Sequence, residues 1–213
     1  MLFATIEILR YVRYLASAIV IPLATLVLLR KTLKEKKEIG NFNYIRLIII
    51  AIFSCFALIS ILQYIVEFNI MPSFNNLFGG NIETFNIYSM LIGTMVSLGL
   101  TLAFYANKWE AFYFVMLFIF GGMIILYLLT GFEAWVQIYI LMAAIGSLIF
   151  MYLTSFRIKD NGALGLSIFF TLVYSTLILD ELIIVQVIIM SYNVFIIVFS
   201  LGLFRPFKTE VVN

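Results

Sequence analysis

Polar side chains recur at helical spacing inside otherwise apolar stretches of the chain. Asn193 is the centre of one such stripe, with Gln186 and Ser200 seven residues to either side. An amide in apolar surroundings needs partners for both its donor and its acceptor, so it either bridges two helices or belongs to a binding site. Together the stripes supply these candidate ligand-binding residues: Asn193, Gln186, Gln63, Tyr64, Glu67, Thr94, Ser97, Tyr174 and Asp180.

The polar stripes are expected to turn toward the interior of a helix bundle, because polar groups that face lipid are costly. If they converge, they line a polar cleft that opens outward, with Glu67 and Asp180 at its mouth. Each residue type also has a plainer interpretation. Serine and threonine bond back to their own helix or allow close packing, and the two carboxylates are then solvated loop charges. The residues alone leave both alternatives open.

Chemistry beyond binding finds little support in the side chains available. The chain has no histidine and a single cysteine, Cys55, which excludes histidine-based metal sites and an intrachain disulfide. Asp180 and Glu181 are adjacent, and no base or nucleophile is spaced to join them. The last apolar stretch has no lysine before Lys208, which excludes retinal-type chemistry. We therefore expect no catalytic residue, no metal site and no cofactor.

The elements that carry these residues are predicted to be membrane-spanning helices. Of 213 residues, 64% are hydrophobic and 11% charged, and the mean hydropathy is +1.14; a soluble domain carries about 25% charged residues. A span needs about 20 apolar residues. The sequence predicts an all-α polytopic integral membrane protein, a seven-transmembrane-helix bundle that forms one domain over 1–213. The predicted spans are 11–29, 45–68, 87–106, 111–130, 135–156, 163–179 and 182–204.

The charges between these spans predict the orientation of the chain. Apart from Arg10 and Arg13, every lysine and arginine falls on one side, and the connections on the other side carry acidic residues. The positive-inside rule then places the amino terminus outside and the carboxyl terminus in the cytoplasm of a cell-membrane protein. Pro22 is expected to kink the first span. Because the basic residues are dispersed, nucleic acid is not expected as a partner.

Two groups of basic residues have more than one interpretation. Arg10 and Arg13 lie at the outer end of the first span, where they either reach the headgroups or Glu7, or bind an anionic ligand or partner. The run after the first span anchors the topology, and it could also contact anionic lipid or a separate signalling or membrane partner protein. The surface residues assigned to that role are Lys31, Lys34, Lys36 and Lys37.

The whole chain resembles the compact seven-helix membrane sensor modules found ahead of histidine kinases and as stand-alone prokaryotic proteins. The likeness rests on the basic loop that begins at Arg30, the span ends at 64–68 and 102–105, and the stretch 152–164. The resemblance implies a receptor-like or partner-binding protein. Since no kinase or other output domain follows Arg205, signalling would pass through a separate partner or the short loops.

A second architecture, the alternative to the sensor module, also fits seven spans in length and orientation. Spans one to three and five to seven could form parallel repeats around a linker helix, as in the sugar-transporting and PQ-loop families that the chain also resembles. Asn193 would then contact a small solute near the membrane midplane. Against this interpretation, the chain has no Pro-Gln pair, and span five has no counterpart of Pro22.

Overall fold

The computed structural model describes residues 2–71, 87–131, 133–176, 179 and 183–202, and within them the chain is helical with no strand. Six of these helical segments are long and apolar enough to cross a membrane. The elements are α1 (Leu2–Ile39), α2 (Tyr44–Glu67), α4 (Ile87–Ala106), the 3₁₀ helix η1 (Glu110–Phe112), α5 (Val115–Thr130), α6 (Glu133–Ile158), α7 (Asn161–Ser175) and α8 (Ile183–Leu201).

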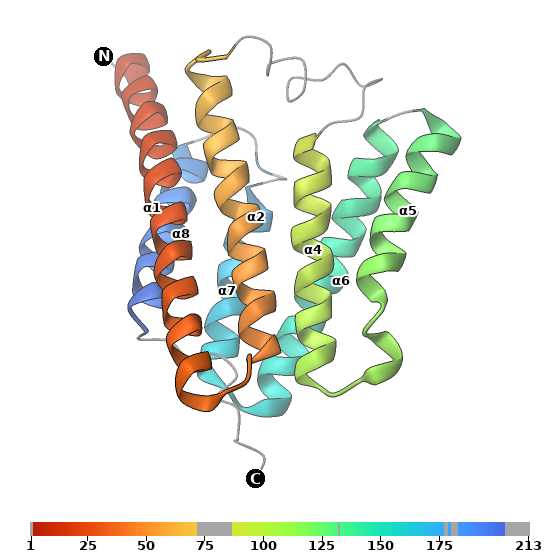
Figure 1. Cartoon of the computed structure of the whole chain (residues 1–213). Helices are drawn as coiled ribbons and strands as arrows, with labels where there is room; N and C mark the ends of the chain where they lie inside the picture. Colours follow the sequence, from red (N-terminus) through yellow and green to blue (C-terminus); the bar gives the residue numbers. More distant parts are fainter. Residues whose placement is uncertain (1, 72–86, 132, 177–178, 180–182, 203–213) are drawn as a thin grey trace.

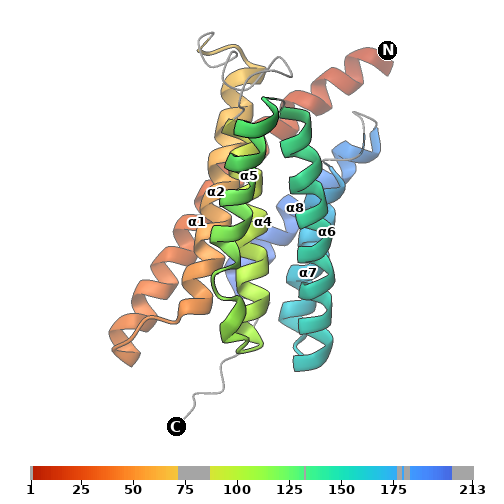
Figure 2. The same ribbon diagram turned by 90° about the vertical axis from the view of Figure 1, so that its right-hand side faces the viewer.

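Six helices form a closed ring, and α5 lies outside it. Successive helices alternate in direction, so that α1 begins at one end of the bundle and α8 ends at the other (Figure 1). Around the ring, α1 packs on α2, α2 on α4, α4 on α6, α6 on α7, α7 on α8 and α8 on α1. Among the described elements, helix α5 packs mainly on α4 and α6 (Figure 2). The ring therefore closes through α4 and α6 without α5.

Local sequence signals set several helix ends. The Asn43 side chain accepts a hydrogen bond from the backbone N–H of Ile45 (3.0 Å) and caps α2. Asp160 caps α7 in the same way through Gly162 N–H (2.7 Å). Helix α5 ends at Gly131, whose φ of 67° is the left-handed conformation that glycine adopts most readily. These caps fix where the bundle turns.

Helix α1 is longer than the predicted span 11–29. It runs through the basic segment that the sequence analysis placed in a connection, and it ends just before Gly40, where φ is +85°. Lysine, glutamate and leucine are good helix formers, and no glycine or proline interrupts them before that point. Pro22 lies inside this continuous helix. The basic residues therefore form the last turns of α1.

Six of the seven predicted spans correspond to helices that are long and apolar enough to cross a membrane. The predicted span 111–130 begins with η1, and its α-helical part starts at Val115. Helix α7 has 15 residues and ends at Ser175, before the predicted bound of 179. At about 1.5 Å per residue, α7 rises about 22 Å, less than the roughly 30 Å of a bilayer core. The other four helices, α2, α4, α6 and α8, lie within three residues of their predicted bounds.

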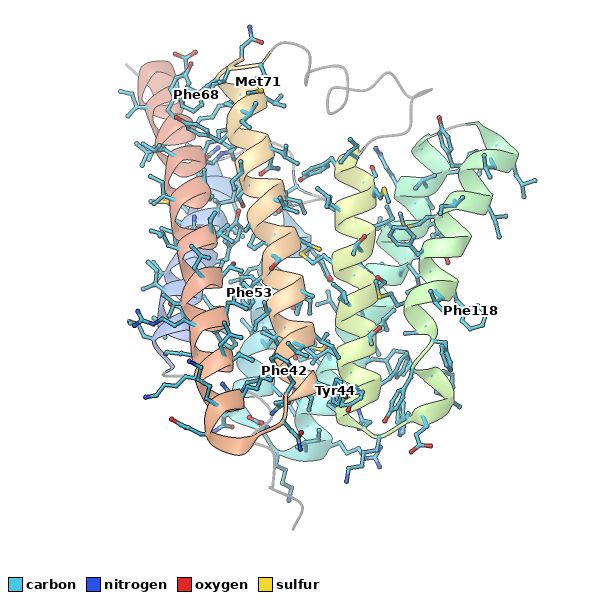
Figure 3. The ribbon with its side chains drawn as sticks, in the orientation of Figure 1. Phe42, Tyr44, Phe53, Phe68, Met71 and Phe118 are labelled. Carbon is cyan, nitrogen blue, oxygen red and sulfur yellow. The ribbon has the colours of Figure 1, made fainter. Side chains whose placement is uncertain are left out.

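Aromatic side chains fill the centre of the ring. Phe53 of α2 is fully buried, and its ring centroid lies 5.6 Å from that of Phe169 and 5.4 Å from that of Phe199. Phe169 also contacts Phe56 at 5.9 Å. In contrast, Phe118 of α5 is 75% exposed and points away from the bundle (Figure 3). The interior of the ring is thus closed by stacked rings from α2, α7 and α8.

Candidate functional site

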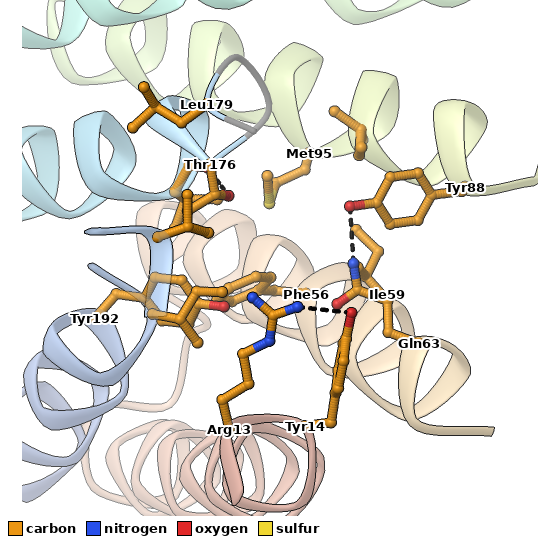
Figure 4. A pocket seen from close by; sticks show the side chains of 14 residues that line it. Arg13, Tyr14, Phe56, Ile59, Gln63, Tyr88, Met95, Thr176, Leu179 and Tyr192 are labelled. Carbon is orange, nitrogen blue, oxygen red and sulfur yellow. Dashed lines mark hydrogen bonds between the residues drawn. The ribbon is translucent and has the colours of Figure 1, made fainter. Parts of the chain in front are cut away.

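A cavity of about 180 Å³ lies inside the ring at the end where α1 begins, and we call it the N-terminal cavity. It has room for roughly ten water molecules. Side chains of α1, α2, α4, α7 and α8 line it, together with the chain just beyond α7 (Figure 4). Polar and apolar side chains share the lining almost equally, and its polar members are Arg13, Tyr14, Gln63, Tyr88, Thr176 and Tyr192.

Arg13 turns into the bundle and does not extend toward the outer surface. Its side chain lines the cavity although the residue is only 4% exposed. One terminal nitrogen, Nη2, donates to the Tyr14 hydroxyl at 2.8 Å, and the guanidinium carbon lies 4.4 Å from the centre of the Tyr14 ring. These contacts hold the guanidinium at the cavity wall. The interpretation of Arg13 as a headgroup contact is therefore wrong.

The helical repeat of α1 explains why Arg13 faces inward. Ser17, Ile21 and Ala24 follow it at spacings of four, four and three residues, and all four are buried. Small side chains on that face allow α1 to approach α2 and α8 closely. This spacing is visible in the sequence, and it could have placed Arg13 on the inner face of α1, where a site would lie.

One hydrogen-bonded pair and one aromatic pair complete the walls and floor of the cavity. Gln63 donates through Nε2 to the Tyr88 hydroxyl at 2.9 Å, which joins α2 to α4. At the floor, the rings of Phe56 and Tyr192 meet edge to face, with centroids 5.3 Å apart. Hydrogen-bonding groups therefore surround one part of the cavity and aromatic rings close it below.

Of the candidate residues from the sequence, Gln63 is the one found in the cavity wall that the structure describes. Asn193 is buried and donates through Nδ2 to Ser17 Oγ at 2.9 Å, so it bridges α8 and α1. Gln186 is also buried, and its Oε1 has no hydrogen-bond partner among the described residues. Asn193 therefore bridges two helices, which is one of the two interpretations left open by the sequence, and its partner is Ser17.

The predicted mouth of the cleft is not formed by Glu67. Its Oε1 lies 2.7 Å from Nε of Arg10, in an ion pair outside the cavity lining. Tyr64 packs against Phe68, with ring centroids 4.5 Å apart and the ring planes tilted by 40°, and it does not belong to the lining either. Asp180 lies outside the described residues. Arg10 explains this difference from the prediction, because its ion pair draws the Glu67 carboxylate toward α1.

The remaining candidates take part in helix packing. Thr94 donates to the carbonyl of Met90 and Ser97 to that of Thr94, both at 2.8 Å. Tyr174 is buried beside the close approach of α4 to α6. A Cβ added to Gly99 there would lie 3.7 Å from the Tyr174 hydroxyl and closer still to α6. For these three residues the structure supports the plainer interpretation.

A second cavity of about 370 Å³ lies at the opposite end of the bundle, and we call it the basic crevice. It is formed by the last turns of α1, the start of α2 and the end of α8. Lys31 lines it and donates through Nζ to the carbonyl of Ser200 at 2.6 Å, near the end of α8. Arg46 pairs with Glu35 at 2.9 Å across the same crevice.

The basic residues assigned to surface contact differ in their surroundings. Lys31 is engaged with α8, whereas Lys34 is largely exposed and lies 3.9 Å from Glu38. The ammonium of Lys36 lies 4.0 Å from the centre of the Phe42 ring. Lys37 is exposed. Lys34, Lys36 and Lys37 are thus accessible at this end of the bundle, and Lys31 is a structural contact.

In chemical terms, the lining of the N-terminal cavity suits binding better than catalysis. The described residues contain no group of three histidine, cysteine or acidic side chains that could hold a metal ion. What converges in the cavity is a guanidinium, an amide and several phenol hydroxyls beside an apolar surface. Such a combination orients a small molecule through a few polar contacts.

Comparisons with protein-family models, with curated proteins and with solved structures give no match for this chain. The resemblances to seven-helix sensor modules and to 3+1+3 transporters therefore stay predictions.

Proposed function

We propose that this protein is a membrane-embedded receptor of the sensor type, which binds a small molecule in the N-terminal cavity. The observation that carries the proposal is the cavity itself, in which Arg13, Gln63 and three tyrosines face a common space inside an otherwise packed ring. Sites of this kind are concave, mostly apolar and furnished with a few placed polar groups. Output would pass to a separate partner protein at the end of the bundle that carries Lys34, Lys36 and Lys37.

The proposed orientation has seven spans, the amino terminus outside and the carboxyl terminus in the cytoplasm. Support comes from the alternating directions of the helices and from the basic residues gathered where α1 ends and α2 begins. The N-terminal cavity then opens outward. Reporter tags fused to each terminus and probed in intact cells test this orientation. Both tags on the same face would refute it, and would point to α7 as the helix that does not span.

Two matched tryptophan variants test ligand binding in the cavity. Ile59 is buried in the lining, and its neighbour Leu58 is 51% exposed on the outer face of α2. Purified protein in phosphatidylcholine nanodiscs is melted with 3-phenylpropanol, 3-phenylpropanoate or phenethylamine. We expect at least one probe to raise the Tm of the wild type and of Leu58→Trp, but not that of Ile59→Trp. The proposal fails if no probe acts on the wild type, or if Ile59→Trp responds equally.

A small-solute transporter is the second candidate, and one arrangement favours it. The N-terminal cavity and the basic crevice lie at opposite ends of the ring, and the contacting aromatic rings of Phe56, Phe169, Phe53 and Phe199 lie between them. The position of α5 outside the ring also leaves three of the described α-helices before it and three after it, as a linker helix would. Uptake of a bound probe into proteoliposomes would establish transport. Binding without uptake would support the receptor.

A further inference from the structure

The basic crevice lies at the end of the bundle opposite the N-terminal cavity, between the last turns of α1, the start of α2 and the end of α8. We propose that it binds the headgroup of an anionic phospholipid from the adjoining leaflet. This inference goes beyond the proposed function, because it assigns a ligand to a part of the molecule outside the N-terminal cavity. Under the proposed orientation the leaflet is the cytoplasmic one.

The cations of the crevice lie at the depth of lipid phosphates. Lys31 comes two residues after the apolar stretch 11–29, a rise of about 3 Å along α1. Lys34 follows one helical turn later. Arg46 lies in the first turn of α2, at the start of the apolar stretch 45–68. Side chains at these positions reach from the edge of the hydrocarbon core into the headgroup layer, where an anion would meet them.

Lys31 has hydrogen-bond donors available for such an anion. Among the described residues its ammonium makes one hydrogen bond, to the carbonyl of Ser200 at 2.6 Å. An ammonium carries three N–H groups, so two are left for a ligand. Gly202 keeps the adjoining space open, because a Cβ added there would lie 3.3 Å from Nζ of Lys31. The side chain is thus held in place by α8 and still presents its charge to the crevice.

The acidic side chains of the crevice do not cancel its positive charge. Glu35 lies 2.9 Å from Arg46. Glu38 lies 3.9 Å from Lys34, and both of these side chains are largely exposed. The hydrogen-bond partner of Lys31 is a neutral carbonyl. Three cations against two carboxylates leave the described lining with one net positive charge, which complements the single negative charge of a phosphodiester headgroup.

The apolar side of the crevice favours a lipid over a free phosphate. Leu28 and Ile49 line it about one helical turn closer to the membrane centre than the cations on the same helices. Phe199 of α8 belongs to the same lining. The volume of about 370 Å³ leaves room for a glycerol backbone beside the phosphate. Inorganic phosphate would satisfy the cations and leave this apolar surface uncovered, whereas a phospholipid covers both.

The experiment measures how tightly single lipids bind the purified full-length chain, by native mass spectrometry from a mild detergent. The probes are phosphatidylglycerol, phosphatidylcholine and glycerol 3-phosphate, that is, an anionic lipid, a lipid without net charge and a phosphate ester without acyl chains. We expect phosphatidylglycerol to bind more tightly than phosphatidylcholine by about fivefold or more, the effect of one basic side chain near an anionic headgroup. Glycerol 3-phosphate at equal concentration should not displace phosphatidylglycerol.

Matched variants on α1 locate the site. Lys31→Gln should lower the affinity for phosphatidylglycerol by about three- to tenfold, and Lys31→Arg should keep it within about twofold, because the charge remains. Lys37→Gln is the control. It removes the same charge from an exposed side chain at the same end of α1, outside the described lining, so the affinity should stay within about twofold of the wild type.

Thermal melting of each variant shows that it remains folded. If Lys31→Gln does not fold, Lys34→Gln takes its place, because it removes an exposed cation of the crevice whose carboxylate partner is 3.9 Å away. In that variant the affinity for phosphatidylglycerol should fall by about threefold, and an unchanged affinity would refute the proposed site.

Three other results would overturn the inference. Equal affinity for the two lipids would show that charge is not recognised. Equal losses in Lys31→Gln and Lys37→Gln would show that the whole basic end attracts the lipid and that the crevice does not. Displacement by glycerol 3-phosphate would assign the crevice to a soluble phosphate compound. None of these measurements involves the N-terminal cavity, so the receptor proposal stands or fails separately.

Discussion

Replacing Phe53 by alanine tests whether the aromatic rings at the centre of the bundle hold the fold together. In a membrane, unfolded helices remain in lipid, so removing an apolar side chain costs little transfer free energy. What is lost is packing against Phe169 and Phe199, both within 6 Å by ring centroid. The substitution deletes about 100 Å³ of side chain, and at about 24 cal/mol per Å³ the empty volume lowers the free energy of unfolding by about 2.4 kcal/mol.

The assay is reversible unfolding in mixed micelles with an increasing fraction of sodium dodecyl sulfate, followed by circular dichroism. Phe118→Ala is the matched control, because the same atoms are removed from a side chain that is 75% exposed on α5. Its free energy of unfolding should change by less than about 0.5 kcal/mol. Equal losses in the two variants would show that the interior rings contribute no more than lipid contacts do, and the packing argument would fail.

The remaining predictions concern contacts between helices, each measured as a change in the free energy of unfolding in the same micelles. Lys31→Met removes the ammonium near the end of α8 and should cost about 1 kcal/mol, whereas the exposed Lys34→Met should change little; equal effects would contradict the contact. Gly99→Ala places a Cβ 2.8 Å from a hydroxyl oxygen of α6, so it should lower the free energy of unfolding by about 1–3 kcal/mol. The control is Gly121→Ala, whose Cβ meets nothing within 4 Å, so it should stabilise α5 by up to about 1 kcal/mol. Asn193→Ala breaks the bridge to α1 and should cost about 0.6–1.7 kcal/mol; no coupling to its serine partner in a double-mutant cycle would show that the bridge is not made in lipid.

The number and type of the helices follow from hydropathy, but some of their limits do not. An apolar run between Asn86 and Asn107 defines α4 to the residue. The basic end of α1 was placed in a connection because hydropathy registers the edge of an apolar region, whereas a helix continues until a residue such as Gly40 ends it. The position of α5 outside the ring depends on which faces of α4 and α6 meet. Several interacting helices determine those faces together, so a scan of single stretches cannot assign them.

The site was predictable in part. The amide of Asn193 was identified as a residue in need of a partner, and the structure supplies Ser17, which is 176 positions away in sequence. Such a partner cannot be read from spacing within one span. The sequence left two roles open for Arg13, a contact at the membrane surface or the binding of an anionic ligand or partner, because the position of a residue near the end of a span does not show which way its side chain points. Comparison of the inner and outer faces of α1 would have shown that Arg13 faces inward.

The stacked rings between the two cavities also bear on how a membrane containing this protein keeps its ion gradients. A protein with a hollow at each end would let protons and small ions leak if the two hollows were joined by water. Phe53 and Phe169 are at most 1% exposed, and phenyl rings offer no groups along which a chain of water molecules could be ordered. If the chain crosses the bilayer as proposed, the same rings that support the helices would also insulate the two cavities from each other, and any cargo that crossed would have to part them for the moment of its passage.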